Sequence, residues 1–398
     1  MQLYLQIGHG MQEHTRELLT RWGGGGAILS PRDLTEAQVI RLAGDVIKRG
    51  GEPLLDPQCY VRDADHEKLV AHEYWKSIHT HATGAFTGGP GTDALLADLA
   101  ALAKSAGIQT HILPAPLADP VDDVWLDAQA ALIAAARKHY KGDQLLATIA
   151  ISSDALRDDD QMEAVVDNAE QWEVDGYYLA AEVPSGYLVD DPVWVANLLI
   201  LASGLKLHDR RVVVGYAHHQ MLCLAGANVD QIACGTFLNA RAFDTKKFFE
   251  RDEDEISRRA TWYYAPESLS EYKLQFLDLA MRAGVLEKLR PPKRYKRDYS
   301  DPLFAGAQPS LVGWKETEAF RHYLDMLKQQ ANECRKASFE DTVDDYEKRL
   351  DRAETLMAAL KKDGIRGQDR DFANYVDVNR GAVARLRAAR GPRLRRRW

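Results

Sequence analysis

The sequence predicts an α/β fold, a (β/α)8 TIM barrel followed by a C-terminal helical domain, and three observations carry that prediction. Short apolar segments alternate with longer amphipathic ones eight times over about 240 residues, which is the count and length of such a barrel. The short segments are apolar throughout, as parallel strands buried on both faces should be. Glycines often precede them, where helices end in C-terminal caps. A doubly wound sheet is the alternative, but it usually has fewer strands.

The expected strands end in polar or glycine-bearing loops. They are residues 3–7, 27–29, 53–55, 109–113, 145–151, 177–180, 211–214 and 231–234. Helical periodicity falls between them, in residues 35–48, 93–106, 122–140, 161–172 and 194–207. Residues 62–90 are too many for an ordinary βα loop. We expect a lid, a binding loop or an insertion with structure of its own there.

Composition narrows the class of protein. The chain has 398 residues, of which 45% are hydrophobic and 28% are charged, as in soluble globular proteins. It contains no uncharged apolar run of about 18 residues, so we expect no membrane span, and its start does not resemble a secretory signal. The four cysteines are widely spaced without a C-x-x-C pair, which argues against a disulfide framework and a thiolate zinc site. We therefore expect a cytoplasmic protein.

Positive charge is concentrated at the end of an acidic chain. The net charge is −8, yet residues 380–398 hold eight arginines and no acidic residue. An acidic body repels a phosphate backbone at long range, so contact with nucleic acid is expected only at local basic patches. This tail is one such patch and residues 288–297 are another. The alternative is a solvated end that needs no partner.

The pattern becomes helical after about residue 250. An amphipathic helix is expected over 268–283, and a linker with prolines and glycines follows to Gly313. Two further helices are expected over 316–334 and 339–360. The second carries apolar residues at alternating four- and three-residue steps, a heptad seam that would pack in a helical bundle.

The last segment, 369–390, is similar to half of a helix-turn-helix motif, with Val376 and Val378 in the turn. We therefore divide the chain into a barrel, a helix with its linker, and a helical region whose basic end is helix-turn-helix-like. These parts span residues 1–265, 266–313 and 314–398.

Polar residues follow every expected strand, and in such barrels the site lies at the C-terminal strand ends. They are His9, Arg32, Asp33, Asp56, Gln58, Tyr60, Asp119, Ser153, Asp154, Glu182, Tyr216, His218, His219, Thr236, Asn239 and Arg241. We expect Asp56, Asp154 and Glu182 to meet at one mouth, although Asp154 also fits an N-cap. Close carboxylates suit acid–base or nucleophilic chemistry, because their pKa values separate, and they accept the N–H groups of a purine-like edge. Tyr187 could stack on a flat base, whereas Tyr177 and Tyr178 read as core.

Histidine pairs invite a metal interpretation. His79 and His81 stand one residue apart in the long third loop, and His218 precedes His219. No carboxylate is clearly paired with the first two, so solvated or structural histidines are preferred, and we expect no metal and no cofactor. A metal-dependent hydrolase using His9, His79, His81 and His218 stays as an alternative.

A family resemblance adds to this interpretation. VVVGYAHHQMLCLAGANVDQIACGTFLNARAF, residues 212–243, resembles the seventh and eighth strands of the tRNA-guanine transglycosylase superfamily. Asp230, Cys234 and Arg241 fit its G-[VA]-D-x-x-D-C motif and the arginine that follows. YYLAAEVP, residues 177–184, resembles its base-holding G-G-L-A-V-G-E segment. The resemblance covers about residues 1–265 and is closest to the DNA-modifying, phage- and defence-associated members.

The resemblance implies roles for individual residues. Leu179, Ala180 and Glu182 would hold the base, and Asp56 in LLDPQCY would contact the nucleoside. Asp154 falls roughly at a base-contacting glutamine of the family. The expected catalytic residues are Asp56 and Asp154. The expected substrate-binding residues are His9, Gln58, Tyr60, Leu179, Ala180, Glu182, Tyr216, His218 and Arg241.

Two departures from the family bear on function. Ala233 stands where the family has its nucleophilic aspartate, and the zinc signature is missing. The chain is therefore expected to act as a transferase of the base-exchange type through another carboxylate, or to recognise its ligand without catalysis. The expected ligand is a 7-deazaguanine, or queuine-type, base, free or on a nucleic acid or partner protein, in an antiviral defence setting. We also expect Asp56→Asn to abolish function without unfolding the protein.

Overall fold

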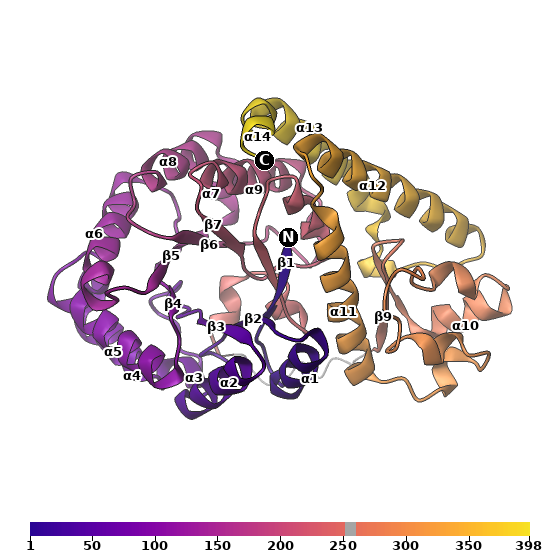
Figure 1. The fold of residues 1–398 in the computed structure, drawn as a ribbon, viewed down its shortest axis with the longest axis horizontal. Coiled ribbons are helices and arrows are strands. Elements are labelled where there is room, and N and C mark those ends of the chain that lie inside the picture. The colour runs from indigo at the N-terminus through magenta and orange to yellow at the C-terminus, as the bar shows by residue number, and fades with distance from the viewer. Residues whose placement is uncertain (251–259) are drawn as a thin grey trace.

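The eight expected strands form one parallel sheet in the computed structural model, which describes residues 1–250 and 260–398. They are β1 Gln2–Gln6, β2 Gly25–Leu29, β3 Gly51–Leu55, β4 Thr110–Ile112, β5 Gln144–Ile151, β6 Gly176–Ala181, β7 Arg211–Val214 and β8 Gln231–Cys234. Their order is β3-β2-β1-β8-β7-β6-β5-β4, so β1 and β8, the first and last of these strands along the chain, are neighbours. The sheet curls into a nearly closed (β/α)8 barrel (Figure 1), which confirms the predicted fold class.

Helices cover the outside of the barrel (Figure 1). The main ones are α1 Gln12–Trp22, α2 Glu36–Lys48, α5 Pro90–Ala106, α6 Asp123–His139, α8 Asp159–Ala169 and α9 Pro192–Lys206. The long segment before α5 is an insertion with its own helices, α3 Glu67–Val70 and α4 Glu73–His81. Thr35 illustrates why the helices begin where they do: its side chain accepts from the Gln38 amide while Gln38 reaches back to the Thr35 amide.

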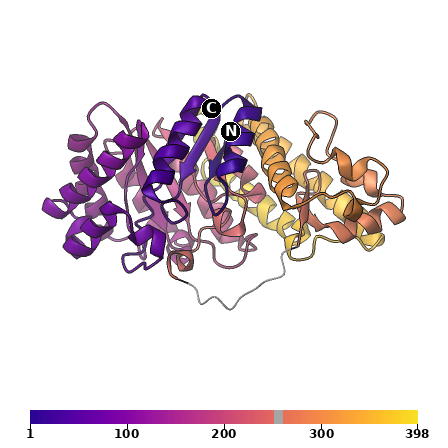
Figure 2. The same ribbon diagram turned by 90° about the horizontal axis from the view of Figure 1, so that it is seen from below.

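A second body of structure lies beside the barrel (Figure 2). It holds the hairpin β9 Trp262–Ala265 and β10 Ser270–Lys273, then α10 Leu274–Arg282, α11 Glu316–Cys334, α12 Phe339–Lys362, α13 Val376–Ala389 and α14 Gly391–Arg397. The prediction of a single helix over 268–283 is wrong for its first part, because residues 270–273 form the strand β10. Ser270, Glu271 and Tyr272 are buried against β9 as a strand, and only the remainder is helical. In the described chain, no helix is long and apolar enough to cross a bilayer.

The predicted heptad of α12 is confirmed, because all its apolar positions are buried. They are Phe339, Val343, Tyr346, Leu350, Ala353, Met357 and Leu360. The helix-turn-helix prediction is wrong. The expected turn at Val376 and Val378 lies inside α13, which packs along α9 as one continuous helix, and the expected first helix is two short 3-10 turns.

The arginine tail folds back onto acidic side chains of the same chain. Arg385 pairs with Asp159 at 2.6 Å, Arg390 pairs with Glu163 at 2.6 Å, and Arg397 pairs with Asp209, which ties the tail to the barrel. Arg387 and Arg395 pair with acidic residues of α12. These pairs explain how an arginine-rich end packs on an acidic body. Contact between the tail and nucleic acid stays a prediction.

Candidate functional site

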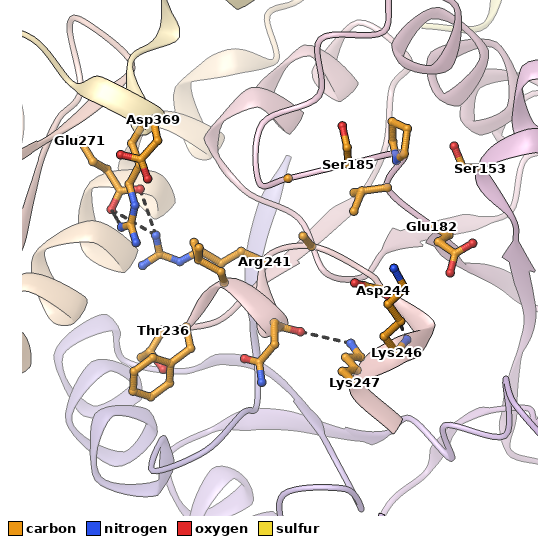
Figure 3. Close-up of a pocket in the computed structure, with 18 of the residues that line it drawn as sticks. Ser153, Glu182, Ser185, Thr236, Arg241, Asp244, Lys246, Lys247, Glu271 and Asp369 are labelled. Carbon is orange, nitrogen blue, oxygen red and sulfur yellow. Dashed lines mark hydrogen bonds and ion pairs between the residues drawn. The ribbon is translucent and has the colours of Figure 1, made fainter. Parts of the chain in front are cut away.

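A polar cleft of about 1210 Å³ opens at the C-terminal ends of the strands. Its walls come from the loops after β1, β4, β5, β6 and β8, from the β9–β10 hairpin and from α11. Figure 3 shows Glu182 and Ser153 on one side of the opening and Arg241 with Glu271 on the other. The cleft therefore lies where the barrel mouth meets the C-terminal body.

The cleft brings together part of the predicted site. Its predicted members are His9, Asp119, Ser153, Asp154, Glu182, Thr236, Asn239 and Arg241. The other predicted residues do not line it. They are Arg32, Asp33, Asp56, Gln58, Tyr60, Leu179, Ala180, Tyr216, His218 and His219, and all but Arg32 and Asp33 are buried. Of the three carboxylates expected to meet, only Asp154 and Glu182 share the cleft.

Glu182 follows β6 and is anchored on one side only. Its Oε1 accepts hydrogen bonds from Thr245 Oγ1 at 2.6 Å and from the Thr245 amide at 3.3 Å. Its Oε2 has no hydrogen-bond partner among residues 1–250 and 260–398. Asp154, by contrast, is 89% exposed at the rim and pairs with Arg157 at 2.8 Å. Glu182 is thus the positioned acceptor of the cleft, and Asp154 is a rim charge.

Three other oxygen atoms of the lining are buried and have no hydrogen-bond partner among the residues that the structure describes. They are Ser153 Oγ, Thr236 Oγ1 and Asn239 Oδ1. Ser153 begins α7 after β5, whereas Thr236 and Asn239 both follow β8, so the lining combines two segments that are far apart in the sequence. Buried polar groups are normally satisfied, so these three side chains keep unused hydrogen-bonding capacity in the wall of the cleft.

A buried ion cluster closes the opposite side of the cleft. Glu271 lies 3.3 Å from Arg241 Nη1 and 3.0 Å from Arg370 Nη1, and the Arg241 guanidinium stacks 3.5 Å from the centroid of the Tyr323 ring. Burial raises the pKa of Glu271, but the two guanidinium groups outweigh it and hold the pKa below its ordinary value of about 4.5. Arg241 follows β8, Glu271 is in β10 and Arg370 precedes α13, so the cluster joins barrel and C-terminal body.

The Glu271 cluster predicts acid sensitivity. Its folded-state pKa is lowered, so its stabilisation is complete above about pH 4.5 and is lost as pH falls through the lowered value. Urea unfolding of the wild-type protein and of Glu271→Gln, measured from pH 6 to pH 3, checks this. The difference in unfolding free energy between the two should shrink toward low pH. A pH-independent difference would contradict the ionised carboxylate.

Asp56 lies behind the cleft in a network of tyrosines. Its carboxylate accepts from Tyr60 Oη at 2.7 Å, Tyr216 Oη at 2.7 Å, Tyr178 Oη at 3.2 Å and the Gln58 amide at 3.0 Å. Burial raises the pKa of Asp56, while the hydrogen bonds from Tyr216, Tyr60 and Gln58 oppose the rise. The Asp56 carboxylate thus accepts hydrogen bonds inside the barrel and outside the cleft lining, and its predicted catalytic role stays a prediction.

This network changes what we expect of Asp56→Asn. The amide nitrogen would replace an oxygen that accepts from two donors, leaving buried hydroxyl groups without an acceptor. We expect a loss of about 1–3 kcal/mol in the free energy of unfolding, measured with urea. Unchanged stability would show that the tyrosine network does not depend on the carboxylate.

His218 and His219 are fully buried under the C-terminal body. His219 packs against the rings of Tyr264 and Tyr323, and burial lowers its pKa to about 3. His79 and His81, expected in the long third loop, lie on α4 of the insertion, and side chains two apart on a helix point in different directions. Within the described parts of the chain, no three His, Cys, Asp or Glu side chains are arranged to hold a metal ion. The metal-dependent hydrolase gains no support from this arrangement.

Several lining residues escaped the sequence analysis because they come from outside the strand–loop pattern. Trp262 and Lys273 stand on the hairpin, Phe320 stands on α11, and Arg370 lies in a 3-10 turn. Lys247 lies 13 residues after the end of β8 and belongs to no motif that the sequence analysis recognised. Only the packing of the C-terminal body against the barrel reveals them.

Comparisons with known proteins add little to this geometry. No protein-family model matches the chain, and no curated protein sequence matches it. Among solved structures, 3-dehydroquinate dehydratase from Aquifex aeolicus VF5 is 11% identical with a TM-score of 0.36, over 62% of this chain and 95% of that one. D-psicose 3-epimerase is 6% identical with a TM-score of 0.27, over 54% and 84%.

The carboxyl transferase domain of Rhizobium etli pyruvate carboxylase is 11% identical with a TM-score of 0.36, over 98% of this chain and 77% of that one. Structural similarity at these TM-scores supports no inference about the activity of this chain. The order and pairing of its own strands identify the chain as a (β/α)8 barrel with a helical C-terminal region.

Proposed function

We propose that the cleft recognises a guanine-like base of the 7-deazaguanine type carried on a larger partner, as a transglycosylase-like barrel would. The observation that carries the proposal is that Glu182, whose Oε2 has no partner in the described part of the chain, lines one cleft with Ser153, Thr236 and Asn239, whose side-chain oxygens are also unpartnered there. The edge of a guanine-type base presents N–H donors, and these oxygens are acceptors of matching chemistry.

The size and walls of the cleft favour a base attached to something larger. Small-molecule sites usually measure about 300–1,000 Å³, and this cleft measures about 1210 Å³. Phe237 and Phe320 lie in its wall with ring centroids 4.9 Å apart, and Trp262 is nearby, so flat surfaces for stacking are present. Lys246 and Lys273 in the lining are suited to contact phosphates of a nucleic acid. A role in nucleic-acid modification or antiviral defence is part of the same proposal.

Recognition without base exchange fits the residues better than the family's covalent route. Ala233 is fully buried in β8 and brings no carboxylate. Asp56 lies outside the cleft lining, and Asp154 is solvent-exposed and paired with Arg157. Neither carboxylate is held beside Glu182 as a poised nucleophile.

Thermal denaturation of the full chain tests recognition. A ligand that binds only the folded state stabilises it by about 2.7 kcal/mol at one hundred times its Kd. We expect 7-deazaguanine and guanine to raise Tm with increasing concentration, and adenine to leave it unchanged. Equal shifts with all three bases, or none with a guanine-type base either free or in an oligonucleotide, would contradict the proposal.

An exchange assay separates recognition from transfer. The protein is incubated with guanine-containing DNA or tRNA and free 7-deazaguanine, and the nucleosides are analysed by mass spectrometry. We expect no incorporation of the deazaguanine. Incorporation would favour the alternative, a base-exchange transferase. Its carboxylate would stand at another position, since residue 233 is an alanine.

A further inference from the structure

Lys247 occupies an unusual place in the wall of the cleft. It belongs to the 3-10 helix Thr245–Phe248 after β8, and only 3% of it is exposed. Its side chain lines the large cleft and also a second cavity of about 10 Å³ behind it, next to Gln58 and Tyr216. The residue therefore belongs to the wall of the open cleft, where Figure 3 shows it, and also to the lining of the small cavity.

The surroundings of the Lys247 amine are aromatic and hold no close counter-ion. Nζ lies 3.3 Å from the centroid of the Tyr216 ring and within 5.2 Å of the centroids of Phe243 and Phe248. It donates a hydrogen bond to the neutral carbonyl of Asn239 at 3.2 Å. In the described part of the chain, Nζ forms no ion pair with a carboxylate at 4.0 Å or less.

Charged groups from three loops face this amine at longer range. They are Asp56 from the loop after β3, Arg32 and Asp33 from the loop after β2, and Asp244 from its own loop. Burial lowers the pKa of Lys247 well below its ordinary value; the three carboxylates oppose that shift and Arg32 adds to it. A buried amine in this setting favours its uncharged form, which is the nucleophilic one.

We infer that Lys247 is a reactive amine that captures the carbonyl carbon of a small aldehyde or ketone entering through the cleft. The Nζ lone pair bonds to the carbonyl carbon as the carbon–oxygen π bond breaks, and the oxygen takes up one of the two Nζ protons to give a carbinolamine. The hydroxyl group then leaves as water with the one remaining Nζ proton, and the nitrogen lone pair forms the carbon–nitrogen double bond of an imine. This site needs only Lys247 and its surroundings, so it stands apart from base recognition.

Reductive trapping tests the inference on the full chain. The protein is treated with glyoxylate and sodium cyanoborohydride, which reduces an imine to a stable secondary amine, and its peptides are analysed by mass spectrometry. Lys246 lines the same cleft but is exposed, so it is the internal control. At pH 7 we expect Lys247 to be modified at least about tenfold more than Lys246, since each unit of pKa changes the neutral fraction about tenfold.

The pH profile distinguishes a reactive amine from a merely accessible one. Labelling of Lys247 should be nearly flat between pH 7 and pH 9, whereas labelling limited by protonation of the amine would rise steeply over this range. Lys247→Arg should abolish the fast labelling. An unmodified Lys247 in wild-type protein, or a Lys247 profile as steep as that of Lys246, would overturn the inference.

Discussion

Glu271→Gln should lower the free energy of unfolding by about 3–5 kcal/mol, because it removes the one carboxylate between two guanidinium groups. Arg241 is 1% exposed and Glu271 is 2% exposed, so water cannot replace the lost partner. Arg370 would also lose its 3.0 Å contact with Glu271. Urea unfolding at pH 7 measures the change.

Glu267→Gln is the matched control for this prediction. Glu267 lies in the turn of the same hairpin but is partly exposed, and it pairs with Arg294 at 2.8 Å and Arg352 at 3.9 Å. A pair of this kind contributes about 0–1 kcal/mol, so the control should lose less than about 1 kcal/mol. Equal losses in the two variants would contradict the prediction. The buried Glu271 cluster would then contribute no more to stability than a partly exposed ion pair.

Glu182→Gln should weaken binding of a guanine-type base about 10- to 100-fold. A hydrogen bond to a charged group contributes about 1.5–3 kcal/mol, and every 1.4 kcal/mol is tenfold in affinity. The glutamine can still accept from Thr245 through its oxygen, but its amide nitrogen would then present a donor where the base needs an acceptor. Isothermal titration calorimetry with 7-deazaguanine measures the change.

Glu316→Gln makes the same chemical change on the opposite wall of the cleft, at the start of α11. It should alter the affinity less than about twofold if Glu182 acts by direct contact. If both variants weakened binding equally, the effect would come from the overall charge of the cleft rather than from a hydrogen bond to Glu182.

The barrel was predictable because its strands are apolar along their whole length and end at polar loops. The heptad of α12 was predictable for a similar reason, since each of its apolar positions faces a neighbour. The hairpin was missed because Ser270, Glu271 and Lys273 look like a polar helix surface in sequence. They form a strand because β9 offers its edge and Arg241 and Arg370 compensate the buried Glu271 charge.

The site was predictable only in part, for physical reasons. Residues in the segments that follow strands do line the cleft, as the sequence predicted. Examples are His9, Asp154, Glu182 and Arg241. Asp56 also follows a strand, but Tyr60, Tyr178 and Tyr216 enclose it, and no sequence pattern reveals which loops fold over a strand end. Lys247 and Trp262 reach the cleft through tertiary packing alone.

A crystal structure of the full chain with 7-deazaguanine at saturating concentration tests base recognition most directly. Our account predicts planar density in the cleft, with a ring nitrogen or exocyclic nitrogen within hydrogen-bond distance of Glu182 Oε2. A base bound at any other surface, or a cleft without the base while the crystals diffract well, would contradict it.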